Sequence, residues 1–168
     1  GGLLRKEGWE VEVAGSGVFP PEDGLCDNAL AWDVDLKYSN GVEMSFTSDG
    51  GKNEHGIRFE GSEGWVYVRR GFIDAHPKSL LQSVIGPNEN HLPVSDNHQQ
   101  NLLDSIRTRR PPVSPIDVAV RSDTICHLSD IAMRLGRKLR WDPEKEEFPG
   151  DADANRMLTR ALRSPWRL

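Results

Sequence analysis

The spacing of apolar residues changes halfway along this chain, from every second residue to every third or fourth, and this change limits the fold more than any other feature. Apolar and polar side chains alternate over residues 32–38 and again over 42–47, with Asn40-Gly41 between the two runs. Both turn residues tolerate positive φ, so the pattern predicts a tight antiparallel hairpin. One face of this hairpin carries Trp32, Val34, Leu36, Tyr38, Val42, Met44 and Phe46, and the other carries Asp33, Asp35, Lys37, Glu43, Ser45 and Thr47.

A second hairpin is predicted over residues 57–70, with its turn at 61–64, and residues 9–13 fit a further strand. Val66 and Val68 fit a covered face of the second hairpin. The open face then carries Trp65, Tyr67 and Arg69. Large aromatic side chains on an open face need a partner, which makes these three residues the candidate interface residues.

Three helices are predicted in the second half of the chain. Ser95 is the expected N-cap of the first helix, and Pro111-Pro112 ends it. A longer helix begins at Pro115 and continues to about Gly136, and residues 151–162 predict a last helix with an acidic start and a basic end. Strands followed by helices favour an α+β fold, a mostly antiparallel open sheet with helices packed on one face. The length suits one domain, residues 1–168.

Charge and composition exclude several classes of partner. The net charge of −5 repels phosphate backbones, so no nucleic acid is expected, and no apolar run reaches the roughly 20 residues that span a bilayer. Cys26 and Cys126 are too few for a disulfide framework, and Cys126 is expected to be a small buried side chain on a helix. Four arginines at helical spacing predict a solvated face or a subunit contact: Arg156, Arg160, Arg163 and Arg167.

The motifs that could bind a cofactor or a metal do not have the residue spacing that such sites require. Gly15-Ser16-Gly17 follows a predicted strand, but Pro20 occupies the third glycine position of a dinucleotide fingerprint, so the segment is interpreted as a loop without a cofactor. The histidines lack the spacing of a zinc motif, and no metal site is expected. His98 and His127 fall on apolar helical stripes, which favours core histidines; a half-buried imidazole that serves a substrate hydroxyl is the alternative.

Several short motifs follow one another in a specific order and spacing. They are Gly56 to Val66, Arg70-Gly71, His98 with Asn101, Leu102 and Asp104, Arg109 with Pro111-Pro112, Arg121-Ser122, Leu135 to Lys138, Trp141-Asp142-Pro143 and Arg163 to Trp166. Through them the chain, from about Ala31 to Leu168, resembles the C-terminal domain of the Gfo/Idh/MocA oxidoreductases, named for glucose–fructose oxidoreductase and inositol dehydrogenase. It is most similar to the bacterial branch common in planctomycetes and related phyla.

The resemblance implies a dihydrodipicolinate-reductase-like C-terminal domain, whose sheet shapes the substrate pocket and often forms the subunit interface. It also implies an N-terminal Rossmann domain that binds NAD or NADP and is absent from this chain. The family's catalytic lysine has no counterpart here, since neither Lys52 nor Lys78 precedes a proline, and the resemblance places the family's aspartate–histidine motif upstream of this chain. Parent proteins of this branch often look exported through a twin-arginine signal, which leaves cytoplasm and periplasm both open.

The chain is therefore expected to be the substrate-binding and oligomerisation domain of an NAD(P)-dependent oxidoreductase that acts on a sugar or cyclitol. Alone it is expected to be inactive, and to form a homo-oligomer through the sheet face. Arg58, His98 and Arg121 are the candidate substrate-side polar groups, against the alternative of ordinary ion pairs and helix caps. Two other functions stay open: a stand-alone dimerisation module, or a non-catalytic module that stacks a sugar on Trp65.

Overall fold

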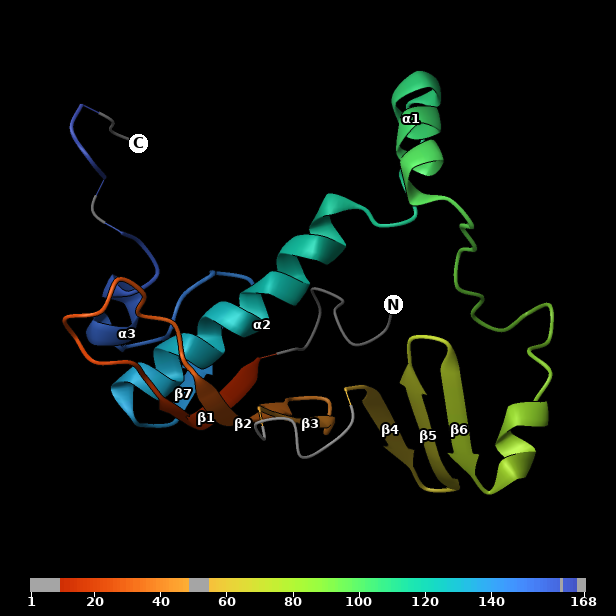
Figure 1. Cartoon of the computed structure of the whole chain (residues 1–168), viewed down its shortest axis with the longest axis horizontal. Helices are drawn as coiled ribbons and strands as arrows, with labels where there is room; N and C mark the ends of the chain where they lie inside the picture. The colour runs from red at the N-terminus through yellow and green to blue at the C-terminus, as the bar shows by residue number, and fades with distance from the viewer. Residues whose placement is uncertain (1–9, 49–54, 161, 166–168) are drawn as a thin grey trace. The chain divides into compact units, whose positions relative to one another are not determined.

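The computed structural model describes residues 10–48, 55–160 and 162–165. The chain divides into two compact units: the first unit comprises Gly1–Asp49 and Ser114–Leu168, and the second unit comprises Gly50–Val113. Each unit is built around its own antiparallel sheet (Figure 1). The predicted α+β class and the antiparallel strands are confirmed, but the strands lie in two sheets instead of one.

The sheet of the first unit has the strand order β3-β2-β1-β7. Its strands are β1 (Val11–Val18), β2 (Ala31–Tyr38), β3 (Glu43–Thr47) and β7 (Leu139–Trp141). Val34 pairs with Phe46 and Leu36 pairs with Met44, which confirms the predicted first hairpin and its apolar face. Gly41 turns this hairpin with a φ of 85°.

β1 extends through the residues that the glycine pattern places in a loop, and that interpretation is wrong. The segment from Gly15 to Val18 pairs with β2 along its whole length. A Cβ atom at Gly15 would lie 2.8 Å from the Asp33 carbonyl oxygen and 2.8 Å from a methyl group of Val34. Glycine is therefore required here because the two strands approach closely.

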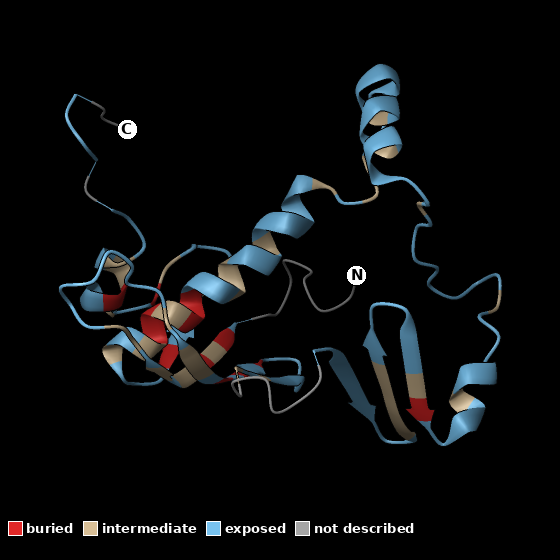
Figure 2. Cartoon of the chain, in the orientation of Figure 1, coloured by how far each residue is buried: buried red, intermediate tan, exposed pale blue. Residues whose placement is uncertain are grey.

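The C-terminal half of α2 (Ile116–Leu135) covers one face of this sheet. Figure 2 shows the buried residues gathered where α2 crosses the strands. Removal of these apolar side chains from water is the main favourable contribution to the folding of the unit. The core consists of Val11, Val13, Val34, Leu36, Tyr38, Leu128, Ile131, Ala132, Leu139, Trp141, Phe148 and Ala154.

α2 has the predicted ends, with Pro115 as its N-cap and Gly136 as its C-cap at a φ of 62°. Its apolar stripe is buried only in part, however. Ile131 lies in the core, whereas Ile116 and Val120 are exposed. All four buried residues of α2 lie in its C-terminal half, so the first turns of the helix extend beyond the packed region (Figure 2).

α3 (Ala152–Arg156) is shorter than the helix predicted over residues 151–162. The N–H groups of Met157 and Leu158 donate to carbonyls three residues earlier, so the hydrogen-bond ladder of an α-helix does not continue. Met157 packs against the core instead. The predicted helical stripe of arginines is therefore wrong beyond Arg156, and Arg167 lies outside the described residues.

Side-chain hydrogen bonds hold the loop between β7 and α3. Asp151 caps α3 by accepting from the Ala154 N–H at 3.1 Å, and Arg137 donates to both Asp151 oxygens at 2.5 and 2.7 Å. Asn155 makes two hydrogen bonds of 2.8 Å with the backbone of Phe148, one in each direction. The buried Phe148 ring then meets Trp141 edge to face, and so ties the loop to the core.

The sheet of the second unit is a meander of β4 (Ile57–Gly61), β5 (Gly64–Arg69) and β6 (Phe72–His76). The pairing of β4 with β5 confirms the second predicted hairpin. β6 follows a turn at Gly71, whose φ is 69°. A 3-10 helix, η1 (Lys78–Gln82), comes directly after β6.

α1 (His98–Thr108) also belongs to the second unit, and it begins with a different cap from the predicted Ser95. Asn97 is the N-cap, because its side-chain oxygen accepts from the Gln100 N–H at 2.9 Å. Arg109 ends the helix in the left-handed conformation, with a φ of 58°, shortly before the predicted stop at Pro111-Pro112.

Cross-strand pairs define the two faces of the second unit's sheet. One face carries Arg58, Glu60, Trp65, Tyr67, Arg69, Phe72, Asp74 and His76, and the other carries Ile57, Phe59, Val66, Val68, Ile73 and Ala75. The prediction of a covered face at Val66 and Val68 is wrong, since Val68 is exposed and Val66 only half-buried. Among the described residues of this unit only Ala75 is buried, because no helix packs on the apolar face as α2 does in the first unit.

Leu36→Ala should lower the free energy of unfolding by about 2–5 kcal/mol, because it leaves a cavity between β2 and α2. Leu25→Ala is the matched control, since Leu25 is fully exposed, and it should change the free energy by less than about 0.5 kcal/mol. Urea denaturation measures both. Equal effects of the two substitutions would contradict the described core.

The hydrogen bonds from Arg137 lower the pKa of Asp151 to about 2, with a further contribution from the Ala154 N–H. The folded-state pKa lies below the ordinary 3.8, so this carboxylate stabilises the fold above pH 4 and loses its contribution as the pH falls toward 2. Arg137→Gln should move the pKa of Asp151 toward 3.8. Titration of the carboxyl carbon by NMR measures this change, and a pKa that stays near 2 would show that Arg137 is not its cause.

Candidate functional site

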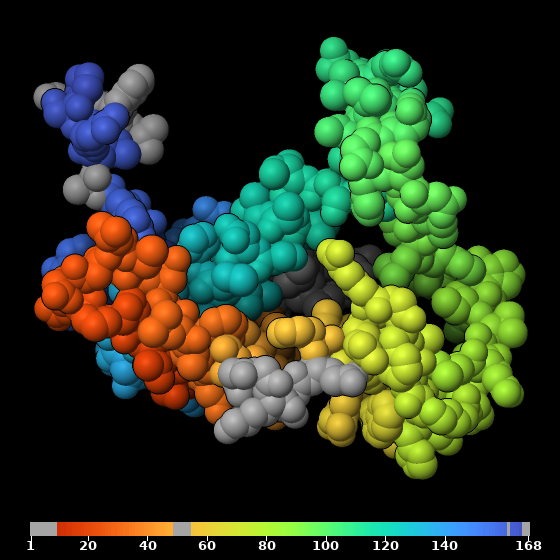
Figure 3. All heavy atoms as spheres, in the orientation of Figure 1, coloured from red at the N-terminus to blue at the C-terminus, as the bar shows by residue number. Residues whose placement is uncertain are grey.

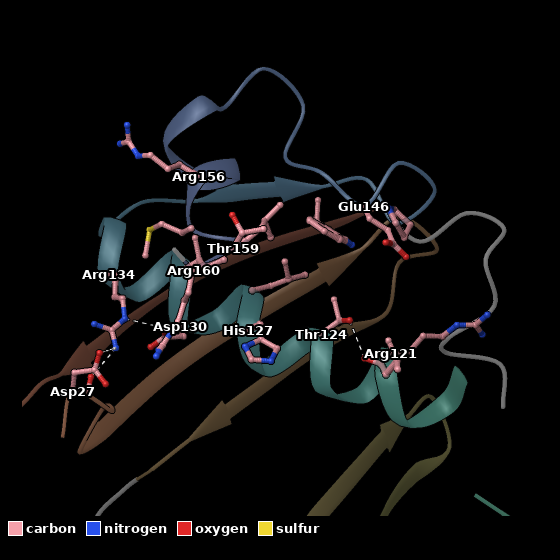
Figure 4. Close-up of a pocket in the computed structure, with 17 residues that line it drawn as sticks. Asp27, Arg121, Thr124, His127, Asp130, Arg134, Glu146, Arg156, Thr159 and Arg160 are labelled. Atoms are coloured by element: carbon pink, nitrogen blue, oxygen red, sulfur yellow. Dashed lines mark hydrogen bonds and ion pairs between the residues drawn. The ribbon is translucent and has the colours of Figure 1, made fainter. Parts of the chain in front are cut away.

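A groove of about 920 Å³ lies along α2 in the first unit. α2, β7, the segment after β7 and the segment after α3 contribute its walls (Figure 4). Small-molecule sites in proteins have volumes of roughly 300–1,000 Å³, and this groove lies at the upper end of that range. It is the candidate functional site.

The floor of the groove is apolar and rigid. Leu128, Ile131 and Trp141 line it, and each is at most 5% exposed because each is also part of the core. Met157 adds a flexible thioether side chain from the segment after α3. A ligand with an apolar face would therefore meet an apolar surface that is mostly part of the core.

Arg134 closes one end of the groove by connecting three parts of the chain. Its Nε donates to Asp130 Oδ2 at 2.8 Å, and its Nη2 donates to the backbone carbonyl of Asp27 at 2.7 Å. The guanidinium also lies 4.7 Å from the ring centroid of Phe19. Figure 3 shows the segment around Asp27, in orange, packed beside α2, in teal. This arginine is held in place by its partners, so it fixes the shape of the groove.

The flank of α2 along the groove presents hydrogen-bonding groups. Arg121, Thr124 and His127 are spaced by three residues and lie on the same side of the helix. His127 Nε2 lies 3.1 Å from Asp123 Oδ2, and Thr124 Oγ1 donates to the Val120 carbonyl at 2.8 Å, which leaves its lone pairs able to accept. The row combines a guanidinium, a hydroxyl and an imidazole above an apolar floor.

The structure does not bring the three predicted substrate-side residues into one site. Arg121 lines the groove, which consists of first-unit residues alone. Arg58 belongs to the second unit, where its guanidinium lies 5.3 Å from the Trp65 ring centroid and 2.5 Å from Glu60. His98 is the first residue of α1 and is exposed.

The predicted interface residues lie together on the aromatic face of the second unit. Trp65 lies between Arg58 and His76, with the imidazole centroid 6.4 Å from the indole. Tyr67 packs over Gly56 and meets Phe72 at 6.2 Å. Both aromatic side chains are consequently half-buried rather than open, and Arg69 is exposed. The guanidinium of Arg58 occupies the indole surface on which a stacked sugar would lie.

The expectation that the two helical histidines belong to the core is wrong. His98 and His127 are both exposed, and so is Cys126, which was expected to be a small buried side chain. Cys126 lies about 200° around the helix from the buried Leu128, at 100° per residue, so it faces away from the sheet. His127 is exposed beside the groove.

Sequence patterns miss most of the groove. The pairing of Asp130 with Arg134 has the i, i+4 spacing of a helical ion pair and is readable from the sequence. The contact of Arg134 with Asp27 spans 107 positions and has no local signal. Thr159 and Arg160 line the groove in the segment after α3, which ends at Arg156. The charge pattern predicts a longer helix and so does not indicate this end.

The segment with Gly15 and Gly17 does not form a dinucleotide fingerprint. It lies inside β1, where Gly15 packs on Val34, so it has no free loop and no following helix to hold a pyrophosphate. Over residues 10–48, 55–160 and 162–165, no three histidine, cysteine, aspartate or glutamate side chains gather in a way that could hold a metal ion. No helix in this described part is long and apolar enough to cross a membrane.

Residues 22–168 match the family model for the oxidoreductase family C-terminal alpha/beta domain of the Gfo/Idh/MocA type. The chain belongs to the Gfo/Idh/MocA oxidoreductase family. The match covers most of the chain. It includes the α-helices α1, α2 and α3 and every described strand except β1. No curated protein matches the sequence. Members of this family are typically NAD(P)-dependent oxidoreductases, and the domain matched here is their C-terminal one.

Proposed function

We propose that the chain is the substrate-binding and oligomerisation domain of an oxidoreductase that acts on a sugar or cyclitol, in the bacterial branch common in planctomycetes. The cofactor, NAD or NADP, is held by a Rossmann domain of the parent enzyme, and this chain alone has no activity. The observation that supports the proposal is the groove along α2, which combines an apolar floor with a row of hydrogen-bonding groups.

The chemistry of the groove suits a polyol. A sugar hydroxyl both donates and accepts, and the row on α2 offers both functions through Arg121, Thr124 and His127. The C–H face of a ring needs an apolar surface, which Leu128 and Trp141 supply. Arg58 and His98 stay predictions as substrate-side residues, because they belong to the second unit.

Titration with myo-inositol or a monosaccharide should give a saturable change in tryptophan fluorescence, because Trp141 lines the groove. Arg121→Ala should weaken this binding by roughly tenfold through the loss of a charged hydrogen-bond donor. Arg107→Ala, on α1 of the second unit, is the control and should leave binding unchanged.

Two further measurements separate the alternatives. Trp65→Phe should leave the fluorescence response intact; its loss would instead favour a module that stacks a sugar on the second unit's sheet. Calorimetry with NAD(H) should show no heat of binding, and saturable micromolar binding would contradict the assignment of the cofactor to another domain. If no polyol tested changes the tryptophan fluorescence, this result would count against the groove as the substrate site.

A second proposal is that the chain self-associates through the sheet of the second unit. The supporting observation is the exposure of this sheet on both sides, with Arg69 exposed on the aromatic face and Phe59 exposed on the apolar face. A three-stranded sheet needs more buried area than Ala75 provides, and a second copy supplies it.

Trp65→Ala should weaken the dimer by roughly tenfold or more, because a half-buried tryptophan at an interface contributes strongly to binding. Arg110→Ala is the control, because Arg110 is an exposed residue of the same unit. Trp32→Ala is unsuitable as a control, since Trp32 packs against the core of the first unit. Sedimentation velocity at micromolar concentration measures the dissociation constant. A strict monomer would overturn the proposed self-association.

A further inference from the structure

β4 forms one edge of the second unit's sheet. Within the described part of the chain it pairs with β5 alone, and all five of its residues are exposed. Proteins commonly protect such an edge with charged side chains, especially lysine, with proline or with a bulge. β4 is charged at Arg58 and Glu60 but has no lysine or proline, and its register with β5 is continuous. No strand of the described residues therefore uses the outer backbone groups of β4.

The two-residue turn Ser62-Glu63 determines which backbone groups the edge presents. Gly61 and Gly64 close this turn, so they form a hydrogen-bonded pair. Hydrogen-bonded and non-hydrogen-bonded pairs alternate along an antiparallel ladder, which makes Phe59–Val66 the next hydrogen-bonded pair. The N–H and C=O groups of Arg58 and Glu60 therefore point away from β5, out of the free edge.

We propose that β4 pairs with β4 of a second copy of this chain, antiparallel and with the two-fold axis at Phe59. In this register Arg58 of each copy lies opposite Glu60 of the other. The outward backbone groups of these two residues then exchange hydrogen bonds across the axis, and Phe59 faces its counterpart in a non-hydrogen-bonded pair. The pairing joins two three-stranded sheets into one sheet of six strands.

The side chains of β4 are complementary to themselves in this register. Arg58 and Glu60 flank Phe59 symmetrically and lie on the same face, so the two-fold axis brings opposite charges together twice. In the single copy the guanidinium of Arg58 contacts its own Glu60, with the two side chains 54% and 66% exposed. Phe59 is 54% exposed and loses part of that exposure when it meets its counterpart.

The opposite edge of the sheet does not have this property. The central residue of β6 is Asp74, so a two-fold axis there would bring two carboxylates together. Asp74 is also occupied by Lys78 of η1, and η1 packs on β6. Charge complementarity therefore selects β4 as the edge that joins two copies.

This proposal rests on the self-association proposed above and is independent of the groove. Arg58→Glu and Glu60→Arg should each raise the dimer dissociation constant by roughly tenfold, because each places like charges opposite one another twice. The double variant restores opposite charges and should dimerise as the wild type does. A mixture of the two single variants should form heterodimers, since one edge is then acidic and the other basic.

Sedimentation velocity of the full chain measures these constants, and Glu63→Arg in the adjacent turn is the matched control, expected to have no effect. Amide hydrogen exchange supplies a second readout: exchange at Arg58 and Glu60 should slow as the concentration rises through the dissociation constant. Circular dichroism checks that each variant is folded; these exposed substitutions should leave the spectrum unchanged.

The outcomes distinguish this proposal from the broader one. A monomeric wild type would overturn self-association altogether. Edge pairing would be overturned by a dimer that weakens with Trp65→Ala but is unchanged by the charge reversals and shows no slower exchange at Arg58 and Glu60. That result would favour contact through the sheet face. Loss of the dimer in both single variants without recovery in the double variant would also overturn the proposed register.

Discussion

The contact between α2 and one face of the four-stranded sheet is the interaction on which the rest of the first unit depends. Leu128, Ile131 and Ala132 fill the surface formed by β1 and β2, and this core holds the C-terminal half of the helix in place. The groove exists because that half of α2 is fixed while its flank stays uncovered. Arg134, on the same half, can then connect Asp27 with Asp130 at the groove's end.

Local patterns were sufficient wherever one short segment determines the structure. The register of β2 with β3 follows from the alternation on both sides of Asn40-Gly41, because a slip by one residue would expose Leu36 and Val34. Both ends of α2 follow from Pro115 and Gly136, whose backbone preferences act without help from the fold. The family resemblance rests on motifs of the same local kind.

Longer-range contacts explain where prediction failed. Gly15 is typical of a loop by composition, but it pairs with β2 as part of β1, and glycine is required there because Val34 leaves no space for a side chain. α3 ends at Arg156 and Met157 packs against the core, a long-range contact that no local signal shows. Of the three candidate substrate-side residues, Arg121 lines the groove, and its contact with a substrate stays a prediction, whereas Asp27 and the segment after α3 are brought to the groove only by tertiary packing.

The two sheets differ in one respect that bears on assembly. The first has a helix on its apolar face and buries a core, whereas the second leaves Ile57, Phe59 and Ile73 exposed and buries Ala75 alone among its described residues. An isolated three-stranded sheet with so little burial has a small free energy of folding, so association and folding of this unit should be coupled. Coupling of this kind would make the order of the second unit depend on protein concentration. The groove would not depend on concentration, because the first unit has its own core.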